Sequence, residues 1–325
     1  MDSYDWRGYN VQPDKRDFSE FRDMSGEEMN ITEQNYAIFV DSSADLSPSL
    51  LQDGKIQMVA MSYTNGAENC ELAGVASDSA MKEFYDGQRR GNLTRTSQVS
   101  PQQFIDAFTP ALQSGRDVLY ISLSGGLTNT KDSFHLANQI LTGDYPDSRI
   151  IEINSLSATG GIGLLAEEAI ANREAGMTVE ENAEVLRELR HNVCHVFMVE
   201  DLMYLKRGGR LDAASAIVGS VLSIKPILVI APDGKLQVID KKRGQKAALK
   251  DMLGRFSGGR DPQRHRVSIV HADAPELAAQ AADEIRALDP KAEISVGMLS
   301  PIIGAHTGPG MLAVIFFGSR DAIMQ

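Results

Sequence analysis

The sequence has little cysteine and no long apolar run. Only two of its 325 residues are cysteines, Cys70 and Cys194, and they do not form a CxxC pair. Two isolated thiols argue against a disulfide framework and fit a reducing compartment. No apolar stretch reaches the ~18 residues of a membrane-spanning helix, and the N-terminus begins acidic, without an apolar segment. We therefore expect a cytoplasmic protein without a secretory signal.

Positive charge is also scarce. The 32 lysines and arginines are outnumbered by 44 acidic residues, which gives a net charge of -12 and a pI near 5.0. Because phosphate recognition needs a basic footprint, this balance argues against nucleic acid as the main partner. The 42% hydrophobic content allows a sizeable core, and the length favours two domains.

Several catalytic motifs are missing. The sequence contains no HExxH, GxxxxGK or GxSxG pattern and no cluster of cysteines and histidines, so we expect no metal site, no cofactor and no ATP site. The segment Gly161-Ile162-Gly163-Leu164-Leu165-Ala166 matches a loose dinucleotide-binding pattern, which leaves a nucleotide-dependent enzyme as one alternative. No ribose-binding acid follows on a second strand, however, and we interpret these glycines as positions of close helix packing.

Residues 1–35 differ from the rest of the chain. They hold nine acidic residues against four basic ones, and their apolar residues are sparse and follow no period. This composition indicates a flexible acidic extension.

Residues 36–158 are predicted to form an N-terminal α/β domain. Strand-like runs alternate with helical stretches, which is typical of a parallel sheet. Ser47-Pro48 and Ser100-Pro101 mark two helix starts, and Gln103 completes a capping box in the second, which Pro110 is expected to kink or end. The predicted strands are Tyr36–Val40, Ile56–Tyr63, Val118–Ser122 and Arg149–Asn154.

Residues 159–325 are predicted to form a C-terminal α+β domain. Thr178 and Glu181 make a capping box for a helix that extends to about Asn192. Pro232-Asp233-Gly234 is a strong hairpin turn signal between two strands. The remaining predictions are strands at His195–Val199, Ile227–Ile230, Leu236–Ile239, Val267–His271, Ile294–Met298 and Met311–Phe317, and helices at Gln245–Phe256 and Pro275–Leu288.

Polar loops follow several of the predicted strands. In an open α/β sheet, ligands bind beyond the carboxyl ends of the strands, where helix N-termini offer free amides. Any single serine or threonine there can equally be a helix cap. The loops contain hydroxyls and few cations, which suits a single carboxylate better than a polyphosphate. The candidate segments are Asp41–Asp45, Arg95–Gln98, Leu123–Thr130, Ser155–Gly161 and the turn His306-Thr307-Gly308-Pro309-Gly310.

These segments resemble the DegV family of bacterial fatty-acid-binding proteins, which includes the binding subunits of fatty acid kinases. The resemblance runs in family order from about Ala37 to Phe317. Two loops depart from the family pattern, because Leu127-Thr128-Asn129-Thr130 replaces Leu-Ser-Gly-Thr and Asn154-Ser155 replaces Asp-Ser. The matching segments are Asp41–Leu46, Thr96–Pro101, Ser124–Thr130, Asp201–Arg210, Gly219–Ile227, Lys242–Gly244 and His306–Gly310.

The resemblance implies a two-domain α/β fold with a long-chain fatty acid in an apolar tunnel between the domains. It places the ligand carboxylate on Thr96 and Ser124, with Gly125 and His306 close by. Further candidates for ligand binding are Ser97, Ser42 and Thr307. The resemblance also implies that the protein is not itself an enzyme and that Arg243 and His306 engage a separate fatty acid kinase, which phosphorylates the bound acid. We expect a monomer.

A basic segment stands out within the acidic chain. From Lys206 to Lys250 there are ten basic and three acidic residues, a net charge of +7. This segment can be a solvated face, with Arg210 capping or pairing locally, or a docking face for an acidic partner or, transiently, for an anionic membrane surface.

Burial of the acyl chain would supply most of the affinity. About 14 methylenes at roughly 0.8 kcal/mol each give on the order of 11 kcal/mol before association costs. The head group then needs hydrogen-bond donors more than a fixed Arg or Lys partner. The competing hypothesis is a Ser/His-dependent hydrolase of a small lipid ester, built from a serine, His306 and an acid such as Asp41, although no nucleophile elbow is present.

Overall fold

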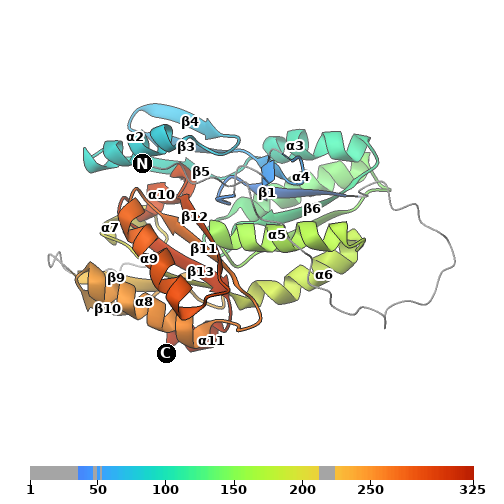
Figure 1. The fold of residues 1–325 in the computed structure, drawn as a ribbon. Helices are drawn as coiled ribbons and strands as arrows, with labels where there is room; N and C mark the ends of the chain where they lie inside the picture. The colour runs from blue at the N-terminus through green and yellow to red at the C-terminus, as the bar shows by residue number, and fades with distance from the viewer. Residues whose placement is uncertain (1–35, 47–49, 52, 212–223) are drawn as a thin grey trace.

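The computed structural model describes residues 36–46, 50–51, 53–211 and 224–325. The predicted extension 1–35 and the helix start at Ser47-Pro48 lie outside these residues. Figure 1 shows two large sheets side by side and a smaller three-stranded sheet next to them. The fold is two-domain α/β, as the sequence predicts, while the exact domain boundary at residue 158 stays a prediction.

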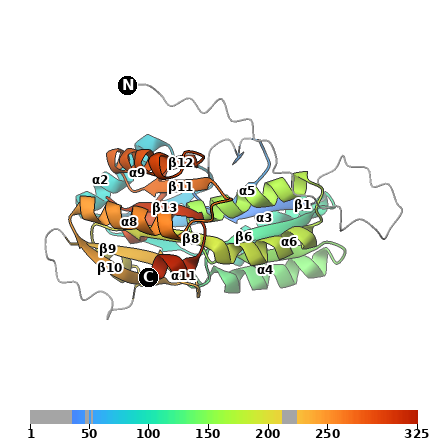
Figure 2. The same ribbon diagram turned by 60° about the horizontal axis from the view of Figure 1, so that its bottom comes forward.

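The first sheet is entirely parallel, with strand order β2-β1-β6-β7. Every residue of its strand β1 is buried because helices cover both faces, and this explains the continuous apolar run in the sequence. Helices α3 and α4 pack on one face, and α5 and α6 pack on the other (Figure 2). The elements are β1 (Tyr36–Asp41), β2 (Gln57–Val59), β6 (Asp117–Ser122), β7 (Ile150–Asn154), α3 (Pro101–Gln113), α4 (Thr130–Asp144), α5 (Gly160–Glu174) and α6 (Val179–Leu189).

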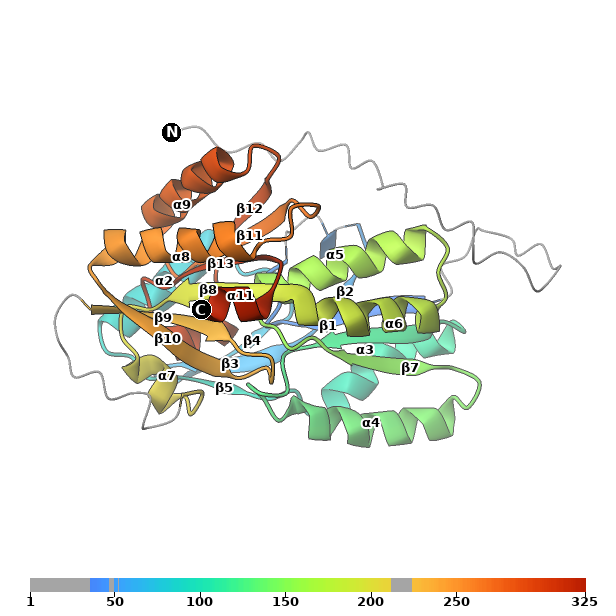
Figure 3. The ribbon, with the colours of Figure 1, turned by 90° about the horizontal axis from the view of Figure 1, so that it is seen from below.

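The second sheet is mixed, with strand order β10-β9-β8-β13-β11-β12 and a single parallel pair, β11 with β12. Helices α8, α9 and α11 cover one face, as Figure 3 shows from below. The other face turns toward α5 and the first domain. The elements are β8 (Val193–Met198), β9 (Ile224–Ile230), β10 (Leu236–Arg243), β11 (Arg266–His271), β12 (Glu293–Met298), β13 (Leu312–Phe317), α8 (Gln245–Gly259), α9 (Pro275–Leu288) and α11 (Arg320–Met324).

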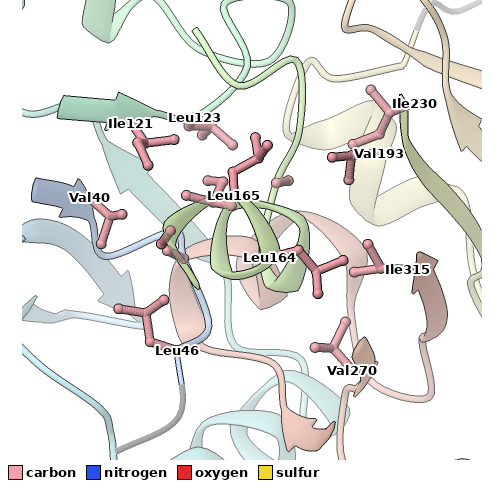
Figure 4. Packing of buried hydrophobic residues seen from close by; sticks show 14 of the residues in the cluster. Val40, Leu46, Ile121, Leu123, Leu164, Leu165, Val193, Ile230, Val270 and Ile315 are labelled. Atoms are coloured by element: carbon pink, nitrogen blue, oxygen red, sulfur yellow. The ribbon is translucent and has the colours of Figure 1, made fainter. Parts of the chain in front are cut away.

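Helix α5 joins the two sheets into one core. Leu164 and Leu165 lie between side chains of the first sheet and side chains of the second, as Figure 4 shows. Its N-terminal glycines permit this approach, because a Cβ at Gly160 would clash with Ser268 and one at Gly161 would clash with His195. Close packing is therefore the structural role of these glycines, as we interpret them from the sequence.

The third sheet, β4-β3-β5, was only partly predicted. The apolar run Ile56–Tyr63, expected as one strand, divides at Ala60 into β2 of the first sheet and β3 of the third. Helix α2 and the two short helices beside the site, α7 and α10, were not predicted from the sequence. The elements are β3 (Met61–Asn65), β4 (Glu68–Leu72), β5 (Thr94–Ser97), α2 (Asp78–Arg89), α7 (Met203–Arg207) and α10 (Pro301–Thr307).

Two predicted helix signals are confirmed and one is corrected. Both capping boxes form, at Ser100 with Gln103 and at Thr178 with Glu181. Helix α3 continues past Pro110 to Gln113, so the proline does not end it. No helix of the described residues is long and apolar enough to cross a membrane.

Candidate functional site

An apolar cavity lies between the two domains. The empty space around its lining atoms is about 740 Å³, which includes space open to solvent. Side chains from the second and third sheets, from the loops after β6 and β7, and from α10 form its walls. The apolar ones are Met61, Leu123, Leu127, Ala158, Phe197, Leu205, Ile230, Leu236, Ile302, Ile303, Met311 and Ala313.

Thr96 and His306 meet at one end of this cavity. Thr96 lies on β5 and His306 in the last turn of α10, and the Thr96 hydroxyl is 2.7 Å from Nε2 of His306. His306 and Thr307, predicted to lie on a turn, instead end a helix that starts after Ser300 at Pro301. The turn itself begins at Gly308, whose positive φ of 74° ends the helix.

Burial controls the charge of His306. Desolvation and the nearby Arg210 cation lower the pKa of His306 to about 4, so the imidazole is neutral at pH 7. Nδ1 is buried, has no hydrogen-bond partner among the described residues, and faces Gly208, where a Cβ would clash with it. Because a neutral imidazole has one N–H, Thr96 and His306 together can donate only a limited number of hydrogen bonds to a ligand.

Arg210 brings a positive charge to the same end of the cavity. Its guanidinium is half-buried, donating from Nε to the Leu127 carbonyl (3.0 Å) and from Nη1 to the Gly208 carbonyl. Burial lowers the pKa of Arg210, but an arginine stays charged at neutral pH. No carboxylate of the described residues forms an ion pair with it. This cation on the cavity wall was not expected from the sequence, where Arg210 was predicted to cap or pair locally.

Ser124 and Gly125 lie beside the cavity rather than on its described wall. The Ser124 hydroxyl is buried, donates to the Gly234 carbonyl at 2.7 Å and accepts from the Gly126 amide. The Gly125 amide donates to Oδ1 of Asn154 at 3.1 Å. These donors are already engaged, so their roles toward a ligand stay predictions.

The three lesser candidates have different surroundings. Ser42 is buried and accepts from the Met61 amide at 2.8 Å. Ser97 is exposed. Thr307 is buried and lines the cavity, and its hydroxyl donates to the Ile303 carbonyl at 3.4 Å. Among these three, Thr307 is the residue that the structure brings to the cavity wall.

The loops after β1, β6 and β7 gather as expected for parallel strands. The Ser124 amide donates to the Ser157 carbonyl (2.9 Å), and the Thr159 amide donates to the Ser43 carbonyl (3.1 Å). Asp41 accepts through Oδ2 from the Leu123 amide and the Tyr120 hydroxyl, and through Oδ1 from Ser43. These bonds fix the loops and leave Asp41 occupied.

Two further polar side chains, His195 and Thr159, line the cavity. Nε2 of His195 is 3.1 Å from the Ala158 carbonyl, and burial lowers the pKa of His195 to about 3. The Thr159 hydroxyl donates to Oδ2 of Asp45. Thr159 belongs to the predicted candidate segment Ser155–Gly161, whereas His195 was not predicted as a ligand contact because it lies inside a strand-like run.

Comparison with known protein families shows which family this chain belongs to. The profile of the family described as "Uncharacterised protein, DegV family COG1307" matches residues 35–319. The chain belongs to the DegV family. The DegV domain-containing protein CPE0026 of Clostridium perfringens is 33% identical over 287 residues, which cover 88% of this chain and 98% of that protein.

Solved DegV structures share the fold. A structure described as fatty acid binding of a DegV family protein from Thermus thermophilus superposes with a TM-score of 0.77 and 26% identity, covering 87% of this chain and 99% of that one. The Streptococcus pneumoniae fatty acid kinase (Fak) B3 protein, loaded with linoleic acid, gives a TM-score of 0.75 at 20% identity, covering 88% and 100%. At 20% identity the likeness to the B3 protein concerns the fold alone.

The geometry of this DegV chain differs from that of a serine hydrolase. Within the described part of the chain, the two cavity histidines bond to the Thr96 hydroxyl and the Ala158 carbonyl rather than to a serine. Ser124 donates to a carbonyl, and Asp41 is occupied by loop amides and hydroxyls. These bonds do not match the serine–histidine–acid order of a hydrolase.

The predicted docking residue Arg243 ends β10 and is exposed. Other bases of the basic segment are engaged, since Lys225 pairs with Glu200 and Lys242 pairs with Asp240 and Asp251. Arg210, predicted to cap or pair locally, does bond to the Gly208 carbonyl but also lines the cavity. The only feature of the sequence that pointed to Arg210 was its place in the DegV-type Gly-Gly-Arg segment.

Proposed function

We propose that the chain binds a long-chain fatty acid in the interdomain cavity, with the carboxylate at the end formed by Thr96, His306 and Arg210. The observation that carries this proposal is a largely apolar cavity with a half-buried arginine at one end. An apolar chain is favoured by the walls, and a carboxylate is favoured by the cation. The Thermus thermophilus relative, described as binding a fatty acid, supports the same ligand class.

Ser124 and Gly125 complete the proposed head-group site. The Ser124 hydroxyl would exchange the Gly234 carbonyl for a carboxylate oxygen, because a charged acceptor forms the stronger hydrogen bond. The Gly125 amide would contribute in the same way if Asn154 turned aside. Ser42, Ser97 and Thr307 are proposed only as lesser contacts.

A titration with matched ligands tests this proposal. Protein freed of lipid should bind octadecanoic acid saturably at about one molecule per chain. Octadecan-1-ol has the same apolar chain but no carboxylate, so it should bind roughly tenfold or more weakly, the scale of one charge-assisted hydrogen bond. Equal affinity for acid and alcohol would contradict a carboxylate site at Arg210, and no saturable binding of either would contradict the cavity as a lipid site.

We further propose that the protein presents the bound acid to a separate fatty acid kinase and does not itself catalyse phosphorylation. Exposed Arg243 and the cavity-end residue His306 are the proposed docking residues. The support is the family resemblance, together with the description of the Streptococcus pneumoniae B3 protein as part of a fatty acid kinase. A kinase needs access to the carboxylate, and the cavity is partly open to solvent.

Reconstitution tests the presentation role. The loaded protein, a fatty acid kinase catalytic subunit and Mg-ATP should yield acyl phosphate, and neither protein alone should. Arg243→Ala should lower the rate without changing fatty acid affinity, whereas Lys250→Ala, which removes another exposed base of the basic segment, should leave the rate unchanged. An equal effect of both substitutions would argue against a specific contact at Arg243.

A further inference from the structure

The hydrogen bond between Thr96 and His306 can run in either direction. The Thr96 hydroxyl can donate or accept, and the ring is neutral at pH 7, so only one of its nitrogens carries a proton. If the hydroxyl donates to Nε2, its proton is used within the pair and Nδ1 carries the ring proton. If Nε2 donates, the hydroxyl proton stays free for a third group. The direction therefore decides what the pair offers to a ligand.

The surroundings of Nδ1 indicate which nitrogen of His306 carries the proton. Nδ1 is buried, has no hydrogen-bond partner in the described part of the chain, and faces Gly208, where a Cβ would clash with it. A proton on Nδ1 would leave a buried N–H group without an acceptor. Among backbone groups, such an N–H is rarer than a carbonyl with an unfilled lone pair, and the same reasoning favours a bare Nδ1.

Arg210 favours the same tautomer. Its Nη1 donates to the Gly208 carbonyl, so the guanidinium cation lies close to the backbone that Nδ1 of His306 faces. A cation attracts the lone pair of a bare nitrogen and repels an N–H dipole that points toward it. Both arguments place the ring proton of His306 on Nε2.

The Thr96 hydroxyl is then an acceptor within the pair and a donor outside it. It accepts from Nε2 of His306, and it has no other hydrogen bond among the described residues. Both residues line the cavity, so an oxygen of a bound ligand is the acceptor within reach. Hydrogen bonds in such a chain polarise one another, so accepting from Nε2 makes the hydroxyl a stronger donor.

We propose that His306 is a positioning residue that acts on the ligand carboxylate through Thr96. Its neutral ring, protonated on Nε2, fixes the Thr96 oxygen as an acceptor toward the ring and directs the Thr96 O–H group to the carboxylate. Arg210 supplies the positive charge of the site and holds the ring in this tautomer. This role of His306 rests on the fatty-acid-binding function proposed above.

Nuclear magnetic resonance of the ring nitrogens tests the tautomer. The full chain contains six histidines, and with isotope-labelled histidine the signals of His306 are those that disappear in His306→Gln. The spectrum of the ligand-free protein at pH 7 should show Nε2 of His306 protonated and Nδ1 bare. A proton on Nδ1, or on both nitrogens, would overturn the proposal even in a protein that binds fatty acid.

A double-mutant cycle tests whether His306 acts through Thr96. Thr96→Val removes the donor and keeps the shape, so octadecanoic acid should bind about 10- to 100-fold more weakly, the scale of one hydrogen bond to a charged group. His306→Leu should cause a smaller loss, because the hydroxyl remains but is no longer held in one direction. The double variant should bind as weakly as Thr96→Val alone. Two losses that multiply would mean that His306 contacts the carboxylate itself, and the proposal would be wrong.

Two further variants separate this role from packing. His306→Gln keeps an N–H group for Thr96 and should bind octadecanoic acid more tightly than His306→Leu; it also serves where His306→Leu does not fold. Equal affinity of these two variants would contradict the proposal. Thr64→Val makes the same change as Thr96→Val on the neighbouring strand β3, away from the cavity wall, and should leave the affinity unchanged. A protein with the expected tautomer that binds no fatty acid would contradict the proposed function, and the role of His306 with it.

Discussion

The Thr96 hydroxyl lies 2.7 Å from Nε2 of His306, although 210 residues separate them in the chain. The small third sheet and α2 hold α10 in this position. Tyr85 donates to the Leu299 carbonyl at 2.7 Å, and Thr94 donates to the Ala305 carbonyl at 3.2 Å. The polar end of the cavity is therefore assembled from segments distant in sequence, and its geometry depends on how the third sheet packs against α10.

The charge of Arg210 should set the affinity for a carboxylate. Arg210→Gln keeps a polar side chain but removes the cation, and a charge-assisted hydrogen bond contributes about 1.5–3 kcal/mol. We expect octadecanoic acid to bind about 10- to 100-fold more weakly by titration calorimetry, with octadecan-1-ol unaffected. Arg207→Gln is the control, because Arg207 stacks on Tyr204 and does not line the cavity. Comparable losses in both variants would contradict a specific role for Arg210.

Ala313 should limit how much chain the cavity can hold. It lies on β13, is 1% exposed and lines the cavity. Ala313→Leu places about three more carbons in the ligand space. Each ligand methylene that these carbons displace from the cavity costs roughly 0.8 kcal/mol of binding free energy. Octadecanoic acid should bind at least about tenfold more weakly, while dodecanoic acid should lose less.

The neighbouring strand position gives the matched control for that experiment. Val314 points to the other face of the sheet and packs in the core under α8 and α9. Val314→Leu should lower stability by overpacking, about 1–3 kcal/mol, without changing the preference between the two acids. A chain-length effect of equal size in this control would show that Ala313→Leu acts through general distortion.

Asp45 should make stability fall as the pH rises from 4 to 6. Its carboxylate accepts from the Thr159 hydroxyl and the Ser300 amide, but burial raises its pKa to about 6. The folded state therefore binds the proton more tightly than the unfolded state, and this stabilisation, about 3 kcal/mol, is lost as the pH passes through 6.

The comparison that isolates this effect is Asp45→Asn. Histidines with lowered pKa values, His195 and His306, contribute the opposite slope below pH 6.5, but they are common to both proteins. Urea unfolding at pH 4, 5, 6 and 7 should show the wild type losing stability relative to the Asn variant. A difference that stays constant with pH would mean that Asp45 titrates normally.

Arg320 should be essential to the junction between the domains. It is buried and donates to the carbonyls of Val193, Ala231, Leu156 and Arg190 at 2.9–3.0 Å. Arg320→Met leaves several of these acceptors unpaired, and we expect a loss of about 3 kcal/mol in urea unfolding. Arg286→Met, which breaks an exposed pair with Asp283, should cost less than about 1 kcal/mol. Similar costs would contradict the structural role of Arg320.

The fold was predictable where local signals agree with tertiary structure. Strand β1 is an unbroken apolar run because it is buried on both faces, and α3 begins at its capping box. The run Ile56–Tyr63 was misleading, since periodicity cannot show that a chain changes sheets at Ala60. Ser300-Pro301 is a helix-start pattern, and α10 does begin there. The apolar strand that follows led to the prediction of a turn in its place.

The candidate site was less predictable than the fold. The resemblance brought Thr96 and His306 to notice, and the structure joins them. Arg210 and His195 line the cavity because of the direction in which a turn and a strand face the other domain. Residue patterns in a single sequence do not specify that direction. For Ser124 the hydroxyl pattern was visible, but its bond to the Gly234 carbonyl arises only when the hairpin packs against the first domain.

Extraction of the purified protein tests the central claim most directly. The protein would be denatured and extracted with organic solvent, and released small molecules would be identified and quantified by mass spectrometry. The account predicts one long-chain fatty acid at about one molecule per chain, and its length and saturation would define the ligand. A lipid-free extract, followed by no saturable uptake of added fatty acids, would contradict it.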